Sequence, residues 1–153
     1  MLDGSRSLND LTEAVIGAAI EVHRNLGPGL PEQAYEAALA HELSARSIPF
    51  HRQAVAAVHY KGVQISECRL DLLIHGVLVI ELKAVEALTK LHEAQLNTYL
   101  RVTGCHLGLL INFNVLRLTS GIRRVANRLP PADLPPSATS ATSAFSNPSD
   151  PPQ

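Results

Sequence analysis

Apolar residues in the first part of the chain recur at the spacing of one helix face. Leu11, Val15, Ala18, Val22 and Leu26 follow one another at steps of four and three residues. This spacing predicts an amphipathic helix with one buried face. Asn9 or Asp10 can cap its start, and Gly27-Pro28 ends it.

A second helix is predicted from Pro31 to about Ala45. Proline fits the first turn of a helix, because its missing N–H would have no partner there. Tyr35, Leu39 and Leu43 form the apolar stripe of this helix. Glu32 lies three residues before Tyr35, so we expect this acid on the buried stripe and not on the solvent side.

The rest of the chain predicts strands around one further helix. Strands are expected over residues 54–60, 64–74, 77–85 and 105–113, with Lys61-Gly62 as a turn. Thr89 can cap a helix that runs to about Val102. Residues 119–129 predict a short closing helix. The order α-α-β-β-β-α-β-α predicts an α/β fold with a mixed sheet.

Composition favours one folded domain followed by a tail. The chain has 153 residues, of which 46% are apolar, as in an ordinary globular domain. Residues 129–153 hold seven of the ten prolines and no periodic apolar face, so they cannot bury enough surface to offset their ordering entropy. We expect a flexible N-terminus over residues 1–8, a domain over 9–128 and a disordered tail over 129–153.

Charge and cysteine content exclude several classes of protein. The formal net charge is −1, so nucleic-acid binding would need a local basic patch. No apolar run approaches the ~20 residues that cross a bilayer, and no secretory signal is apparent. The two cysteines, Cys68 and Cys105, are too few for a disulfide scaffold or a cysteine-based metal cluster. We expect a cytoplasmic protein that does not bind membranes.

Three charged residues interrupt the apolar stretch "RLDLLIHGVLVIELKAV" at residues 69–85: Asp71, Glu81 and Lys83. Burying such groups costs several kcal/mol unless they are paired. Glu81 and Lys83 point to one face because side chains alternate along a strand. A two-residue loop at His75-Gly76 would send Asp71 to the other face. A three-residue loop, for example 74–76 with Gly76 in the left-handed region, would pair Asp71 with Val79 and bring it to the same face.

With that register, the charged residues can form a metal site. The carboxylates of Asp71 and Glu81 and the backbone carbonyl of Leu82 are hard oxygen ligands that suit Mg²⁺ or Mn²⁺. The ion would strengthen a water nucleophile and neutralise charge on a phosphodiester, and Lys83 would hold the attacking water. Glu32 could hold a metal-bound water or complete a second metal position. Gln95 and Tyr99, one helical turn apart, could steer a nucleic-acid backbone or brace Lys83.

Simpler explanations exist for each residue taken alone. Asp71, Glu81 and Lys83 could form an exposed strand face with a weak salt bridge. Glu32 could complement a helix dipole, and Gln95 could be an amide at the edge of the core. The predicted closing helix carries three arginines, Arg123, Arg124 and Arg128. The simplest explanation is that they form a solvated helix face, and a contact with phosphate is the less favoured one.

Taken together, the motifs resemble a known family over residues 8–128. The stretch "GPGLPEQAYEAAL" contains Gly-x-x-Glu-x-x-Tyr at Gly29, Glu32 and Tyr35. The segments "EVHRNLGPGL", "RLDLLI", "VIELKAV", "HEAQLNTYL" and "GLLINFN" are also similar to the GxxExxY proteins, which belong to the PD-(D/E)XK nuclease-like superfamily.

The resemblance implies a restriction-endonuclease-like fold and a set of site residues. Asp71, Glu81 and Lys83 match the acid, acid and lysine of the superfamily, although "LD" replaces the usual "PD". Glu32 matches the helix acid, and Gln95 with Tyr99 resembles the RecB-type nuclease helix motif.

The resulting hypothesis is a metal-dependent nuclease, for which DNA is the favoured substrate and RNA stays open. The alternative is a non-catalytic nucleic-acid-binding or accessory module of a nuclease or repair complex. Small size and near-neutral charge favour a homodimer or a partner subunit. A purely structural protein would leave the polar residues on buried stripes unexplained.

Overall fold

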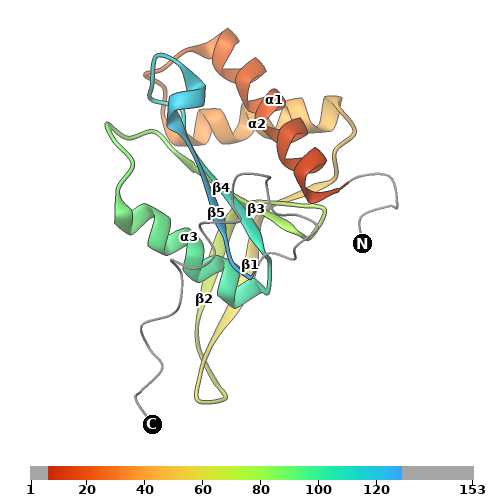
Figure 1. Ribbon diagram of the computed structural model, residues 1–153, viewed down its shortest axis with the longest axis vertical. Helices are drawn as coiled ribbons and strands as arrows, with labels where there is room; N and C mark the ends of the chain where they lie inside the picture. The colour runs from red at the N-terminus through yellow and green to blue at the C-terminus, as the bar shows by residue number, and fades with distance from the viewer. Residues whose placement is uncertain (1–6, 129–153) are drawn as a thin grey trace.

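The computed structural model describes residues 7–128, which form a five-stranded sheet with helices on both faces (Figure 1). The elements are α1 (Leu8–Leu26), α2 (Glu32–Ala45), β1 (Phe50–Tyr60), β2 (Val63–Ile74), β3 (Leu78–Lys83), α3 (Lys90–Thr103), β4 (Leu107–Asn112), the 3₁₀ turn η1 (Leu118–Gly121) and β5 (Ile122–Ala126). The predicted tail over 129–153 and most of the predicted flexible N-terminus lie outside the described residues.

The strands lie in sequence order, β1-β2-β3-β4-β5. The pairs β1–β2, β2–β3 and β4–β5 are antiparallel, whereas β3 and β4 are parallel. A parallel pair needs a crossover connection, which α3 provides. The predicted α/β class with a mixed sheet is confirmed.

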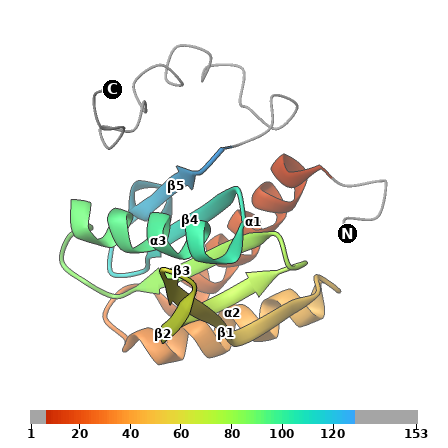
Figure 2. The ribbon, with the colours of Figure 1, turned by 90° about the horizontal axis from the view of Figure 1, so that it is seen from below.

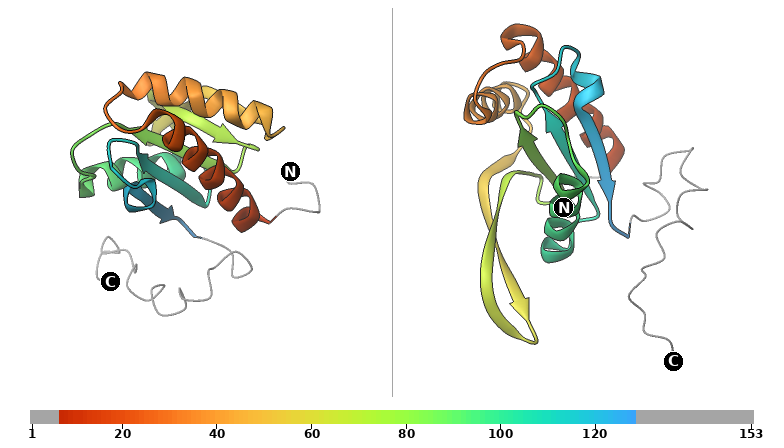
Figure 3. Two further views of the ribbon diagram at one scale, coloured as in Figure 1. Left: turned by 90° about the horizontal axis from the view of Figure 1, so that it is seen from above. Right: turned by 90° about the vertical axis from the view of Figure 1, so that its left-hand side faces the viewer.

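Two apolar cores hold the helices to the sheet (Figures 2 and 3). Helices α1 and α2 cover one face, where Leu39 packs with Ile80 and Leu82 of β3. Helix α3 covers the other face, where Leu96 packs with Val79. Because residues alternate along β3, Glu81 and Lys83 lie on the α3 face. Among the described helices, none is long and apolar enough to span a bilayer.

Helix α3 lies very close to β4 because a glycine faces it. A Cβ at Gly108 would stand 2.7 Å from the Cδ1 atom of Leu96. This absence of a side chain sets the separation of α3 from the sheet, and therefore also the position of the polar residues that α3 presents.

The boundaries of the first two helices and the first strand differ from prediction. The cap of α1 is Ser7, whose hydroxyl accepts the Asp10 N–H, while the Asp10 carboxylate accepts the Ser7 N–H. Asp10 is therefore the third helical residue of a capping box and not the cap. Pro31 is extended and precedes α2. Strand β1 begins at Phe50, four residues earlier than predicted.

The predicted closing helix is wrong: residues 118–126 form η1 and β5. Every residue of β4 is buried, and β5 pairs with the edge that β3 leaves open. An unpaired buried edge would leave backbone N–H and C=O groups without partners. The arginines point in opposite directions, as strand residues do: Arg123 lies 3.9 Å from Glu93 of α3, and Arg124 donates to Asn9 of α1.

Candidate active site

The loop between β2 and β3 brings Asp71 and Glu81 to the same level of the sheet. Strand pairing runs from Ile74↔Leu78 to Leu72↔Ile80, which leaves His75, Gly76 and Val77 as the loop. A three-residue loop with Gly76 in the left-handed region (φ 69°) is as predicted. However, the loop is shifted by one residue along the chain. Asp71 therefore lies opposite Glu81, and its expected pairing with Val79 is wrong.

Beyond Leu72↔Ile80, the two carboxylates take over hydrogen bonds that backbone groups make elsewhere in the sheet. The Asp71 N–H donates to Oε1 of Glu81 over 3.1 Å, and the Leu82 N–H donates to Oδ2 of Asp71 over 2.8 Å. Each acid is thus held by the backbone of the opposite strand. The two side chains lie between the strands, where a regular ladder would leave no room for them.

Strand β2 also rotates at Asp71. Leu70 packs in the α3 core, whereas Leu72, two residues further on, packs in the core of α1 and α2. Regular alternation would place both on one face. Gln53, the residue of β1 that lies opposite Asp71, has a φ of 51°, so the irregularity involves both strands. This rotation lets Asp71 reach both Glu81 and the residues of α2.

Burial raises the pKa values of both acids of this pair. Glu81 is only 5% exposed, and burial followed by the charge of Asp71 raises its pKa to about 8. Burial also raises the pKa of Asp71, against the effect of the Leu82 N–H. A carboxyl hydrogen bond with Asp71 contributes to the raised pKa of Glu81. A pair of this kind ionises fully only when positive charge is supplied nearby.

Lys83 lies on the α3 side of the acids and begins a polar chain along that helix. Its Nζ atom donates to Oε1 of Gln95 over 3.4 Å, and Nε2 of Gln95 donates to the Tyr99 hydroxyl over 2.9 Å. The charge of Lys83 lowers the pKa of Glu81, although less than burial raises it. Burial, then the charge of Glu81, raises the pKa of Tyr99. These two hydrogen bonds thus link three of the predicted residues.

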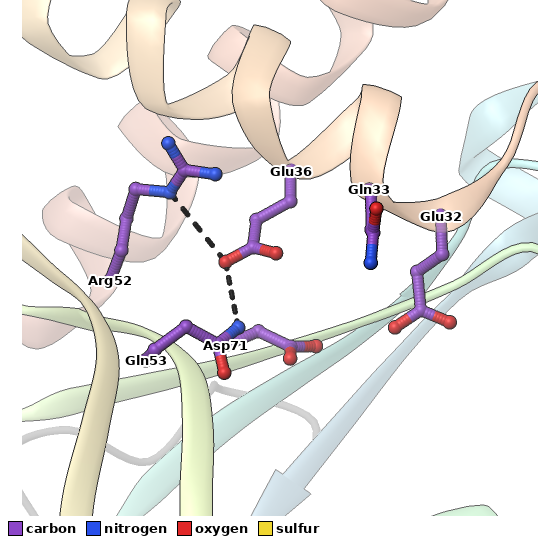
Figure 4. A pocket seen from close by; sticks show the side chains of 6 residues that line it. All are labelled: Glu32, Gln33, Glu36, Arg52, Gln53 and Asp71. Carbon is purple, nitrogen blue, oxygen red and sulfur yellow. Dashed lines mark hydrogen bonds and ion pairs between the residues drawn. The ribbon is translucent and has the colours of Figure 1, made fainter.

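Glu32 approaches the acids from the other side, at the first turn of α2. Burial is the main cause of its raised pKa; the charge of Asp71 raises it further, and Lys83 lowers it. Glu32 also lines a pocket beside Asp71 (Figure 4). The other lining residues are Gln33, Glu36, Arg52 and Gln53.

The sequence did not predict the pocket residues Glu36, Arg52 and Gln53. Glu36 is 8% exposed, accepts a 2.9 Å hydrogen bond from Nε2 of Gln53 and lies 3.6 Å from Nε of Arg52 (Figure 4). The signal for Glu36 was present, because it follows Glu32 by one helical turn and is adjacent to Tyr35 on the buried stripe. Arg52 and Gln53 lie before the predicted start of the strand and carried no such signal.

The Gly-x-x-Glu-x-x-Tyr motif places Glu32 in the site. Gly29 has a φ of 104°, which an L-residue rarely adopts, and so allows the tight connection between α1 and α2. The buried Tyr35 hydroxyl donates to the Gly27 carbonyl and accepts the Leu30 N–H. Its ring stacks on Phe113, with centroids 4.6 Å apart. The tyrosine therefore holds the loop between α1 and α2 in place. This fixes the position of the start of α2, where Glu32 lies.

Asp71 and Glu81 fit a divalent cation by the chemistry of their donor atoms. Their carboxylate oxygens are the ligands that Mg²⁺ and Mn²⁺ prefer, and the positive charge of a cation would lower the pKa values that burial raises. Within residues 7–128, no group of three or more His, Cys, Asp or Glu side chains is arranged to hold a metal. Two carboxylates are nevertheless a usual number for Mg²⁺, which is commonly bound by one or two and keeps several waters.

Comparison with known proteins identifies the family. The model of the PD-(D/E)XK nuclease superfamily matches residues 9–125, and the chain belongs to this superfamily. No curated protein matches the chain. The solved structure titled "Crystal structure of SSO0001" is similar with a TM-score of 0.51 and 20% sequence identity. The match covers 65% of this chain and about half (52%) of that one, and at this identity it supports the fold alone.

Proposed function

We propose that the protein is a metal-dependent nuclease that hydrolyses phosphodiester bonds, with DNA as its substrate. The observation that carries this proposal is the pair of carboxylates, Asp71 and Glu81, held side by side between two strands with Lys83 next to them. Two acids in contact, of which Glu81 is buried and Asp71 half-buried, destabilise a fold unless something binds them. Their position is therefore better explained by a cation than by packing.

In this proposal, Asp71, Glu81 and the Leu82 carbonyl hold Mg²⁺ or Mn²⁺, and Glu32 completes the site from α2. The ion, when bound, neutralises charge on the phosphate and lowers the pKa of water. The ammonium of Lys83 orients the attacking water and stabilises negative charge that develops during attack. Gln95 holds Lys83 in place through its 3.4 Å contact, and Tyr99 holds Gln95.

We further propose that the protein is one of the GxxExxY proteins. Support comes from Gly29, Glu32 and Tyr35, because the structure gives each residue of the motif a separate physical role. The resemblance of Gln95 and Tyr99 to the RecB-type nuclease helix motif supports the proposed nuclease activity.

The test is incubation of the purified protein with single-stranded, double-stranded and nicked DNA in Mg²⁺ or Mn²⁺. We expect cleavage by the wild type and by Glu13→Ala, a control at an exposed acid of α1. We expect losses of at least about 100-fold in Glu81→Ala and Lys83→Ala, since each removes a group placed at the reacting atoms. Cleavage that survives both of the latter substitutions would mean another site or a contaminant.

A second outcome would favour the accessory-module hypothesis. If the wild type binds DNA only when metal is present but cuts neither single-stranded, double-stranded nor nicked DNA, the site binds nucleic acid without catalysis. The same samples, analysed for molecular mass in solution, would show whether the chain forms the homodimer that its small size favours.

A further inference from the structure

A polar network on the α2 side of Asp71 takes no direct part in the proposed chemistry. Gln53 lies at its centre, with its Nε2 atom 2.9 Å from Oε1 of Glu36 (Figure 4). The same Glu36 oxygen lies 3.6 Å from Nε of Arg52. Gln53 also lies opposite Asp71, between the pairs Arg52↔Leu72 and Ala54↔Leu70, and its side chain lowers the pKa of Asp71. Its amide thus lies between two acids that repel each other.

The backbone at Gln53 adopts a conformation that extended strands do not contain. Its φ of 51° lies in the left-handed region, inside the eleven-residue strand β1. Neighbouring residues keep their register, with Arg52↔Leu72 and Ala54↔Leu70 on either side. A positive φ at a non-glycine residue costs of order 1 kcal/mol or more, and such residues cluster at functional sites. Here the conformation turns the glutamine toward Asp71.

The charges around Asp71 explain what an amide does at this position. Asp71 accepts the Leu82 N–H on one side and has the buried, negatively charged Glu36 on the other. A primary amide carries two N–H donors, enough for one bond to each carboxylate. A carboxylate in its place would add a third negative charge, and an apolar group would leave Asp71 and Glu36 facing each other.

We propose that Gln53 is a positioning residue, whose amide separates Asp71 from Glu36 and directs the Asp71 carboxylate toward the Leu82 N–H beside Glu81. The consequence for metal binding rests on the proposed function; the placement of Asp71 does not.

The first test needs neither metal nor activity. In Gln53→Met, which keeps the length but removes both donors, the Leu82 N–H is expected to exchange with solvent at least about 10-fold faster in metal-free protein, because its acceptor is no longer held. The amide of Leu109 in β4 should be unchanged, which shows that the fold is intact. Gln33→Met, at another glutamine lining the pocket, should leave Leu82 exchange at the wild-type rate.

The second test measures Mn²⁺ affinity. Gln53→Met is expected to weaken Mn²⁺ binding about 10-fold, as loss of a residue that orients a ligand typically does. Adding Glu36→Gln should restore affinity to within about 3-fold of wild type, since the repelling charge is then absent. A residue with only a structural role would not show this rescue.

The outcomes separate this inference from the proposed function. Unchanged Leu82 exchange in Gln53→Met overturns the positioning role. Faster exchange with unchanged Mn²⁺ affinity supports the placement of Asp71 by Gln53 but overturns its expected consequence for metal binding. A wild type that binds no Mn²⁺ overturns the proposed metal site, and Leu82 exchange alone then decides the role of Gln53.

Discussion

Replacing Glu81 with glutamine should make the metal-free protein more stable. A carboxyl group whose pKa is higher in the folded than in the unfolded chain opposes folding as the pH rises. At low pH, Glu81 is protonated in both states and has no effect. Between 4.5 and about 8, the unfolded chain releases the proton while the folded chain keeps it. Above about 8, the full difference applies.

The size of the effect follows from the two pKa values. A pKa raised from 4.5 to about 8 corresponds to about 5 kcal/mol at high pH, about 3 kcal/mol at pH 7 and about 1 kcal/mol at pH 5. Glutamine cannot ionise, yet its carbonyl can still accept the Asp71 N–H and its amide can donate to the Asp71 carboxylate. Glu81→Gln should therefore gain about 3 kcal/mol at pH 7.

The assay is urea unfolding followed by circular dichroism, in chelator, at pH 5, 7 and 9. The advantage of Glu81→Gln should grow with pH, whereas Glu67→Gln, at an exposed acid of the same hairpin, should follow the wild type throughout. Millimolar Mg²⁺ should stabilise the wild type and leave the variant unchanged, because binding to the folded state adds stability. Equal stabilities of wild type and Glu81→Gln from pH 5 to pH 9 would refute the reasoning.

Three further substitutions test other parts of the structure. Tyr35→Phe removes the hydroxyl that holds the Gly27 carbonyl and should lower the free energy of unfolding by about 1–3 kcal/mol, measured by urea denaturation; no change would mean that the loop is held otherwise. Lys83→Met should abolish cleavage but leave Mn²⁺ affinity within a few-fold of wild type, and weaker affinity by orders of magnitude would contradict its assigned role. Gly108→Ala places a methyl group against Leu96 and should lower the melting temperature by several degrees, at a cost of about 1–3 kcal/mol; an unchanged melting temperature would mean that α3 moves away freely.

The apolar pattern was sufficient to predict most of the fold. Apolar residues recur every two residues along a half-buried strand and every three to four along a helix, because these are the side chains that are buried away from water. This spacing is visible within each helix or strand by itself. It predicted α1, α2, α3 and the first four strands of the mixed sheet. The pattern failed at residues 118–126, because β5 is an edge strand whose existence depends on the unpaired side of β4. No residue within that segment indicates that the edge of β4 requires a partner strand.

The chain also predicted which polar residues gather at the candidate site, since Glu32, Asp71, Glu81 and Lys83 interrupt stretches that should otherwise be apolar. Hydrophobic burial makes such interruptions costly, so they stand out in a sequence. The chemistry of the donor atoms, paired carboxylates beside a lysine, is therefore evident from the amino-acid sequence alone.

Only the tertiary structure decided how these residues meet. The register of β2 and β3 depends on which three residues form the loop, and it places Asp71 opposite Glu81. Strand β2 supplies side chains to two cores on opposite faces of the sheet. The rotation of β2 at Asp71 and the left-handed backbone conformation of Gln53 occur where the strand changes from one core to the other. Such a compromise depends on packing between distant segments, and for that reason Gln53 could not be recognised from the order of residues alone. Glu36, in contrast, carried a signal, because it follows Glu32 by one turn of α2.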